Sequence, residues 1–332
     1  MAQETRRTFD SHALDIDCVG VVERIERVLR EQIGRGLRRR GAVVGVSGGV
    51  DSAVCVSLAV RALGPERVVG LLMPERDSAS DSTTRGRELC EQLGIEYHLE
   101  DIAPALEALG CYRRRDEAIR RIFPEFDARC RSKITVADDL LETDRLNYFN
   151  LVVELPSGEQ QKVRMPLDVY LTVVASTNMK QRTRKLLEYH HAESRNYAVI
   201  GTPNRLEYEL GFFVRGGDGL ADVKPIGHLY KTQVYAVAEY VGVPEAIREQ
   251  VPCTDTYSLP QTQEEFYFAL PFREMDMLLD AFLHDIPVEM AAPVVGLAVE
   301  QVERVYRDIV SKRRTAELLH QPALLIEEKV RA

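Results

Sequence analysis

The 332-residue chain has the composition of a globular protein, with 45% hydrophobic and 29% charged residues and no low-complexity tract. A formal net charge of −9 argues against a protein that coats nucleic acid, so we do not expect a nucleic-acid partner. The sequence contains no Cys-x-x-Cys pair, no apolar signal segment and no apolar stretch of membrane-spanning length, which predicts a reduced, cytoplasmic protein without membrane contact.

The first hundred residues alternate between helical and strand patterns. Residues 15–40 have apolar positions at three- and four-residue spacing, which is typical of a helix. Three short apolar runs follow, and two helical segments that end at glycine separate them. The runs are GAVVGV (41–46), RVVGLLMP (67–74) and IEYHLEDI (95–102), and the helical segments are 51–64 and 80–94. This alternation predicts an α/β fold with a doubly wound parallel sheet and helices on both faces.

The rest of the chain predicts one domain that spans residues 1–332. We expect residues 104–145 to be mostly helical, and residues 148–155 and 160–171 to form a β-hairpin inside an insertion at 138–172. Further expected elements are a helix at 176–196, a buried strand at 197–202, a helix at 229–244, a lid loop at 250–275, and helices at 273–284 and 298–319. The basic runs at 38–40, 113–115 and 312–314 are expected to be solvated.

The stretch GVSGGVDS (45–52) lies between the first predicted strand and its helix. Gly48 and Gly49 allow the backbone to approach a ligand closely, and a helix N-terminus offers free N–H groups to a phosphate. Asp51 would repel that phosphate unless a cation such as Mg²⁺ lies between them. The alternative is an ordinary turn in which Asp51 only complements the helix dipole. The loop matches neither GxxxxGK[ST] nor GxGxxG.

This strand–SGGxDS–helix unit resembles the pyrophosphate loop of the N-type ATP pyrophosphatases, which adenylate a substrate oxygen. The resemblance implies a Rossmann-like sheet of the adenine nucleotide alpha hydrolase type and a loop that binds ATP together with Mg²⁺. The loop residues so implied in ATP binding are Gly45, Val46, Ser47, Gly48, Gly49, Val50, Asp51 and Ser52.

A second segment narrows the choice within that superfamily. GTPNRLEYELGFFVRGGDGLADVKPIGHLYKTQV (201–234) is similar to the NAD synthetase pattern, and NMKQRTR (178–184) resembles the Asn-x-Lys-x-Arg helix start of that family. The resemblance covers about residues 40–255. It implies an ammonia-dependent enzyme that adenylates the nicotinate carboxylate of deamido-NAD and then replaces AMP with ammonia to give NAD, AMP and pyrophosphate.

The same resemblance implies roles for individual residues. Asp51 and Glu207 would share Mg²⁺, while Thr202, Lys231 and Cys253 would contact ATP. The residues implied in deamido-NAD binding are Arg182, Arg215, Asp222 and Lys312. Asp218 lies in a Gly-Gly-Asp-Gly run and is predicted to form a turn. No side chain is expected to act as a covalent nucleophile, and the sequence identifies no general base.

Partners follow from the resemblance as well. It implies a homodimer, and since 332 residues leave no room for a nitrilase-type glutaminase domain, the expected nitrogen source is free ammonia or a separate glutaminase.

Some positions depart from the family pattern. Pro203 and Asn204 follow the Gly-Thr pair, where Asp-His or Gly-Asn is usual, Cys253 replaces a threonine, and Ser311 replaces a histidine. These changes cluster on the acceptor side, so other functions stay open. They are an amide ligase for another carboxylate, a tRNA-modifying adenylase, and a stress-type protein that binds ATP without turnover.

Overall fold

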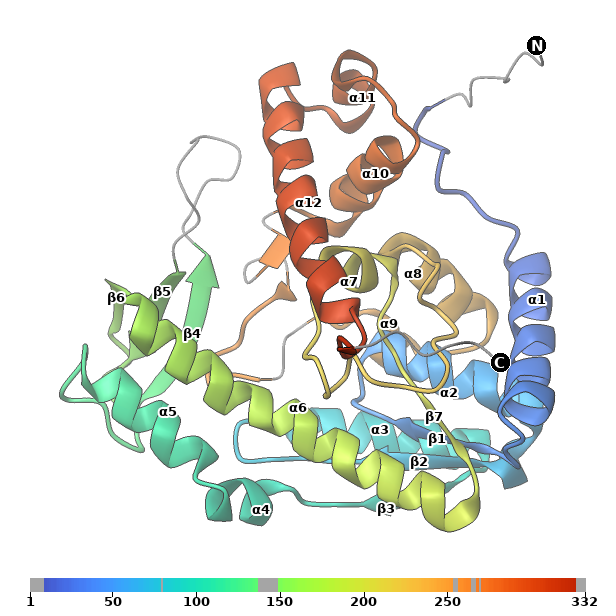
Figure 1. The fold of residues 1–332 in the computed structure, drawn as a ribbon, viewed down its shortest axis with the longest axis horizontal. Coiled ribbons are helices and arrows are strands. Elements are labelled where there is room, and N and C mark those ends of the chain that lie inside the picture. Colours follow the sequence, from blue (N-terminus) through green and yellow to red (C-terminus); the bar gives the residue numbers. More distant parts are fainter. Residues whose placement is uncertain are drawn as a thin grey trace.

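The computed structural model describes residues 9–78, 80–136, 149–252, 256–263, 267–268 and 270–326. Its centre is a four-stranded parallel sheet in the order β3-β2-β1-β7 (Figure 1). The strands are β1 (Ala42–Gly45), β2 (Val68–Leu72), β3 (Glu96–Leu99) and β7 (Ala198–Ile200). The predicted α/β fold with a parallel sheet is therefore confirmed.

Helices cover both faces of this sheet because successive strand side chains point to opposite sides. Ala42 and Val44 pack into one buried cluster with the first set of helices, whereas Val43 packs on the other side with the second set. The first set is α1 (Cys18–Arg30), α2 (Val50–Leu63), α3 (Ser80–Leu93) and α8 (Lys231–Tyr240), and the second is α4 (Ala103–Ala108), α5 (Cys111–Arg120) and α6 (Leu167–Arg195).

The direction of the chain across the sheet reverses beside β1. From β1 the chain goes outward through β2 to β3, and it later returns to add β7 on the opposite side of β1. In doubly wound sheets, ligands bind outside the carboxyl ends of the strands at such a reversal. The ends of β1 and β7 are therefore the expected place for a site.

A second, antiparallel sheet is formed by β4 (Arg131–Val136), β5 (Phe149–Glu154) and β6 (Gln160–Arg164). The first hairpin strand lies where the sequence predicted it, but two expectations were wrong. The second strand ends at Arg164 and not at residue 171, because residues 167–171 begin α6, and residues 131–136 form a strand and not a helix. Arg131 is exposed, Ser132 and Ile134 are buried, and Lys133 between them is half-buried, so residues 131–134 follow the two-residue period of a strand. The bounds of the insertion stay a prediction, and residues 137–148 lie outside the described residues.

The expected start of the helix at 176 was also wrong, because α6 begins nine residues earlier at Leu167, after Pro166. Val169 and Val173 pack against Ile134 and Leu151 of the small sheet. This burial outweighs the preference of β-branched residues for strands.

The remaining helices form a layer beyond the carboxyl end of the sheet, at the top of Figure 1. They are α7 (Arg205–Leu210), α10 (Phe272–Leu283), α11 (Val288–Val295) and α12 (Val299–His320), while the short α9 (Glu245–Arg248) follows α8. The two predicted C-terminal helices are confirmed. The lid at 250–275 stays a prediction, and its last residues belong to α10. Within the described residues no helix combines the length and apolar character needed to cross a bilayer.

Candidate active site

A cavity of about 410 Å³ opens at the carboxyl ends of β1 and β7. The whole loop 45–52 lines it, together with Thr202, Glu207 and Lys231. Residues that the sequence assigned to ATP from three distant segments therefore meet in one place. Cys253 belongs to the same assignment but lies outside the described residues.

The glycine loop has a fixed backbone geometry. Gly48 has a φ of +80°, and a Cβ on it would collide with the carbonyl oxygen of Ser82, so only glycine fits there. The Ser52 hydroxyl donates to the carbonyl oxygen of Gly49 at 3.0 Å and accepts from the backbone N–H of Ser47 at 3.2 Å. These bonds hold the loop at the N-terminus of α2. They place the loop at a helix N-terminus, which is the kind of helix end that binds anions.

Asp51, in the first turn of α2, is held by two side chains from across the cavity. Its Oδ1 accepts from Asn204 Nδ2 at 3.1 Å, and its Oδ2 forms an ion pair with Lys231 Nζ. Lys231 is completely buried, which by itself lowers its pKa, but the charges of Asp51 and Glu207 reverse the effect and raise the pKa of Lys231. The resemblance assigned Lys231 to ATP, and in this structure its ammonium group faces the Asp51 carboxylate.

Lys231 lies at the N-terminus of α8, where the helix dipole is positive and disfavours a cation. Asp276, which the sequence analysis missed, balances this positive end. Its carboxylate accepts the backbone N–H groups of Lys231 at 3.2 Å and Thr232 at 2.7 Å. Burial raises the pKa of Asp276 to about 6. The carboxylate thus takes the first N–H groups of α8 and balances its dipole.

Glu207 faces the same group of charges from α7. Asn204 and Glu207 form a reciprocal capping box, with Glu207 Oε2 accepting from the Asn204 N–H at 3.1 Å, and Glu207 Oε1 accepts from Gln263 Nε2 at 3.2 Å. Burial and, second, the negative charge of Asp51 raise the pKa of Glu207 to about 8, although Lys231 acts to lower it. The single positive charge of Lys231 therefore does not balance two ionised carboxylates, Asp51 and Glu207.

A divalent cation fits this donor set. Carboxylate oxygens are the ligands that Mg²⁺ prefers, and a cation between Asp51 and Glu207 would relieve their repulsion. In the part of the chain that the structure describes, no group of three or more His, Cys, Asp or Glu side chains is arranged to hold a metal. The remaining ligands of such an ion would therefore come from water or from phosphate oxygens.

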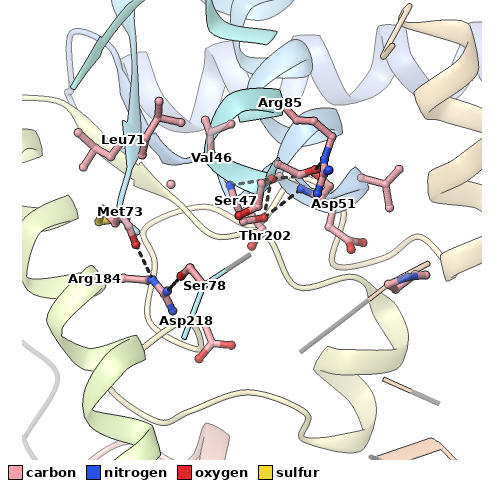
Figure 2. A pocket seen from close by; sticks show the side chains of 18 of the residues that line it. Val46, Ser47, Asp51, Leu71, Met73, Ser78, Arg85, Arg184, Thr202 and Asp218 are labelled. Carbon is pink, nitrogen blue, oxygen red and sulfur yellow. Dashed lines mark hydrogen bonds between the residues drawn. The ribbon is translucent and has the colours of Figure 1, made fainter. Parts of the chain in front are cut away.

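The opposite wall of the cavity carries residues that the sequence analysis did not assign. Figure 2 shows Met73, Ser78 and Arg184 on this side, across from Ser47, Asp51 and Thr202. Arg184 Nε donates to the Met73 carbonyl oxygen at 3.2 Å, and its Nη2 lies 3.5 Å from Ser78 Oγ. Helical spacing contained the signal, since Gln181, Arg184, Lys185 and Glu188, which line the cavity, recur at three- and four-residue spacing on α6, whereas Arg182 does not line it.

Buried acids and a buried base also line this wall. Lys185 and Glu188 form an ion pair of 2.5 Å, and burial raises the pKa of Glu188. Asp218 accepts from the Val214 N–H at 2.8 Å, as a turn-forming residue does, but it also lines the cavity, and burial raises its pKa. The cavity therefore contains carboxyl groups that bind protons more tightly than exposed ones.

Sequence comparison identifies the family. The model of the family described as NAD synthase matches residues 21–140 and 154–316. The chain belongs to the NAD synthase family.

Close relatives carry the corresponding name. The chain is 50% identical to the NH₃-dependent NAD⁺ synthetase of Rhizobium rhizogenes over 96% of both chains, and 52% identical to that of Mesorhizobium japonicum over 95% of this chain and 98% of the relative. The corresponding protein of Thermotoga maritima is 40% identical over 72% of this chain and 79% of its own.

Solved structures agree on the fold. The NMN synthetase of Francisella tularensis superimposes with a TM-score of 0.64 at 24% identity, covering 94% of this chain and 99% of that one. The NH₃-dependent NAD synthetase of Campylobacter jejuni gives a TM-score of 0.61 at 21% identity, covering 94% and 100%. At these identities the likeness shows that the NAD synthase fold is shared.

The residues that the NAD synthetase resemblance assigns to deamido-NAD do not line the cavity. Arg182 and Arg215 are exposed neighbours, with Arg182 Nε donating to the Arg215 carbonyl oxygen at 3.2 Å. Asp222 accepts from the Val199 N–H at 2.8 Å, and Lys312 Nζ donates to the Tyr267 carbonyl oxygen at 2.7 Å. Their role in substrate binding stays a prediction.

Proposed function

We propose that this chain is an ammonia-dependent NAD synthetase, a ligase that uses ATP and Mg²⁺ to amidate deamido-NAD. The observation that carries the proposal is the convergence of Asp51 and Glu207 beside the glycine loop 45–52 in one cavity. Relatives at about half identity over nearly the whole chain bear the name of that activity.

The first step is adenylation. A carboxylate oxygen of deamido-NAD attacks the α-phosphorus of ATP, and the bond to the β-phosphate breaks to release pyrophosphate. The α2 N-terminus and the glycine loop before it would hold the departing phosphates, with the N–H groups of Ser47 and Gly49 exchanging their serine hydroxyl partners for phosphate oxygens. Lys231 adds a positive charge beside them. Mg²⁺ held by Asp51 and Glu207 would neutralise charge on the pyrophosphate.

The second step is amide formation. Ammonia attacks the carbonyl carbon of the mixed anhydride, and the bond to AMP breaks. Ammonium must first lose a proton, and the cavity offers the carboxyl groups of Asp218 and Glu188 as acceptors, because burial raises the pKa of both. Positioning and electrostatics account for the rate, and no covalent bond to the protein is needed.

The acceptor site that we propose is completed by a second copy of the chain. Arg182 lies on α6, the helix that also exposes Leu167, Leu171 and Leu186 with fractional exposures of 71%, 55% and 70%. Large exposed apolar side chains along one helix indicate an interface. A homodimer through α6 would bring the partner's surface over Arg182 and Arg215. Light scattering of the wild type and of Leu186→Glu tests this, since the variant should be monomeric.

The assay of the proposed function uses the purified chain with ATP, Mg²⁺, ammonium and deamido-NAD. We expect NAD, AMP and pyrophosphate in equal amounts, and free ammonium suffices if no glutaminase partner is obligatory. Nicotinate mononucleotide and unrelated carboxylates serve as competing acceptors. Faster turnover of another carboxylate would favour the alternative amide ligase, and AMP formation that requires tRNA would favour a tRNA-modifying adenylase. ATP binding without pyrophosphate release would contradict all three of these enzyme activities.

The proposed location is the cytoplasm.

A further inference from the structure

A second set of buried charges lies next to the cavity but outside it, centred on Lys180 of α6. This side chain has no exposed surface, and its ammonium group uses all three donors. It donates to Glu75 Oε1 at 2.8 Å, to Asp77 Oδ2 at 2.7 Å and to the Thr256 carbonyl oxygen at 2.7 Å. Lys180 therefore joins three segments of the chain at one point.

The acids that Lys180 contacts are held a second time from α5. Arg115 Nη1 donates to Asp77 Oδ2 at 2.5 Å, and the Tyr112 hydroxyl donates to Glu75 Oε2 at 2.8 Å. The expectation that the basic run 113–115 is solvated was wrong for Arg115, whose side chain is only 5% exposed. The reason is tertiary, because Asp77 gives the guanidinium group a buried partner.

Stability alone does not explain these buried charges. Removing two ions from water costs several kcal/mol each, and apolar side chains of similar size often stabilise a fold equally well. What a network of fixed partners provides is a defined geometry for the segments that it joins. The question is then which segments need that geometry.

One of the segments held by Lys180 forms a wall of the cavity. Glu75 and Asp77 belong to the loop after β2, which lines the cavity with Met73, Pro74 and Ser78. Thr256 is the first described residue after the lining segment 250–252, and residues 253–255 lie outside the described residues. One turn further along α6, Arg184 contacts Met73 and Ser78 from inside the cavity (Figure 2). The loop after β2 is thus held by two successive turns of α6.

We propose that Lys180 is a positioning residue for nucleotide binding. Its ammonium group fixes the loop 73–78 and the backbone at Thr256 relative to α6, and so sets the wall that carries Arg184. Lys180 does not line the cavity and is not a catalytic residue. The inference rests on the proposed function only for the identity of the nucleotide.

The test compares three variants of the full chain. Lys180→Met removes the contacts to all three groups and leaves the buried Glu75 without its charged partner, while Asp77 keeps only Arg115, so this variant is expected to lose stability. Glu75→Gln/Lys180→Met removes one charge of each sign, so the network stays neutral and much of the stability returns. Val302→Ala, in the α10–α12 layer, is the matched control that lowers stability away from the cavity.

The measurements are melting temperature, the Kd of α,β-methylene-ATP with Mg²⁺ by calorimetry, and the separate kcat and KM for ATP. We expect the double variant to melt near the wild type and yet to bind the analogue at least about tenfold more weakly, with KM for ATP rising more than kcat falls. Val302→Ala should melt lower with its Kd unchanged.

Two results would overturn the proposal. One is a double variant that binds the analogue like the wild type, and the other is a Val302→Ala control with the same loss of affinity. Failure of the proposed function is a separate outcome. A wild-type chain that binds the analogue but makes no NAD would refute the activity, while the effect of Lys180 on the Kd would still be measured.

Discussion

Lys231 and Asp51 lie in the first turns of two different helices, and their side chains form a buried ion pair at the carboxyl edge of the sheet. Glu207 lies close enough for its charge to raise the pKa of Lys231. One lysine therefore compensates two acids. We expect a bound divalent cation to take over that compensation and to leave the ammonium group of Lys231 to face phosphate oxygens.

Replacing Lys231 with methionine should make the stability of the chain depend on Mg²⁺. Without the lysine, the Asp51 carboxylate loses its ion-pair partner beside a protonated Glu207, which we expect to cost about 3 kcal/mol. Mg²⁺ should restore much of this loss, so the increase in melting temperature on adding Mg²⁺ should be larger in Lys231→Met than in the wild type. Lys312→Met is the control, because Lys312 pairs with Asp308 outside the cavity. Equal Mg²⁺ effects in both variants would contradict the proposed metal site.

Binding of Mg²⁺ should release a proton at neutral pH. The pKa of Glu207 is about 8 in the metal-free chain, so its carboxyl group is largely protonated at pH 7, whereas a metal ligand must be ionised. The apparent affinity for Mg²⁺ should therefore rise with pH, by up to about tenfold per unit, and level off above pH 8. Calorimetric titration with Mg²⁺ at pH 7, in buffers of different ionisation enthalpy, gives the number of protons released on binding. Glu207→Gln should bind Mg²⁺ weakly and release none, and a wild type that releases no proton would refute this assignment.

Asp51→Asn should lower turnover far more than it disturbs the fold. The amide keeps the size of the side chain but removes the charge that holds the cation and Lys231. We expect kcat for pyrophosphate release to fall by about 10² to 10³, the usual effect of losing one group that stabilises transition-state charge. Circular dichroism checks the fold of the variant. Turnover within a few-fold of the wild type would rule out a role for Asp51 in catalysis.

The two glycines of the loop should respond differently to alanine. Gly48→Ala combines a positive φ with a collision against Ser82, so we expect a loss of roughly 1 to 3 kcal/mol in the free energy of unfolding. Gly49 has a φ of −97°, and the nearest atom to an added Cβ is Ser47 Oγ at 3.5 Å, so Gly49→Ala should change stability by less than roughly 0.5 kcal/mol. Chemical denaturation of both variants makes the comparison. Equal losses would mean that the loop lacks this backbone geometry.

Local sequence patterns predicted most elements of the parallel sheet, and they failed where a distant partner decides the structure. Residues 131–136 contain two bases and were expected to be helical, yet pairing with β5 makes them a strand. In the NMKQRTR motif the resemblance pointed to Arg182, while Arg184 is the arginine that lines the cavity. Which side of α6 turns toward the cavity depends on how the helix packs against the small sheet and the parallel sheet.

The sequence by itself determined the strand–loop–helix unit at 45–52, its glycines and the family, because backbone conformation, hydrophobic period and helix capping depend on neighbouring residues. Only the tertiary structure decided which charges meet. Asp51 pairs with Lys231 across 180 positions, and Lys180 pairs with Glu75 across 105. Such pairs form because packing buries these groups together, and a buried charge must find an opposite charge within reach, wherever in the chain that partner lies.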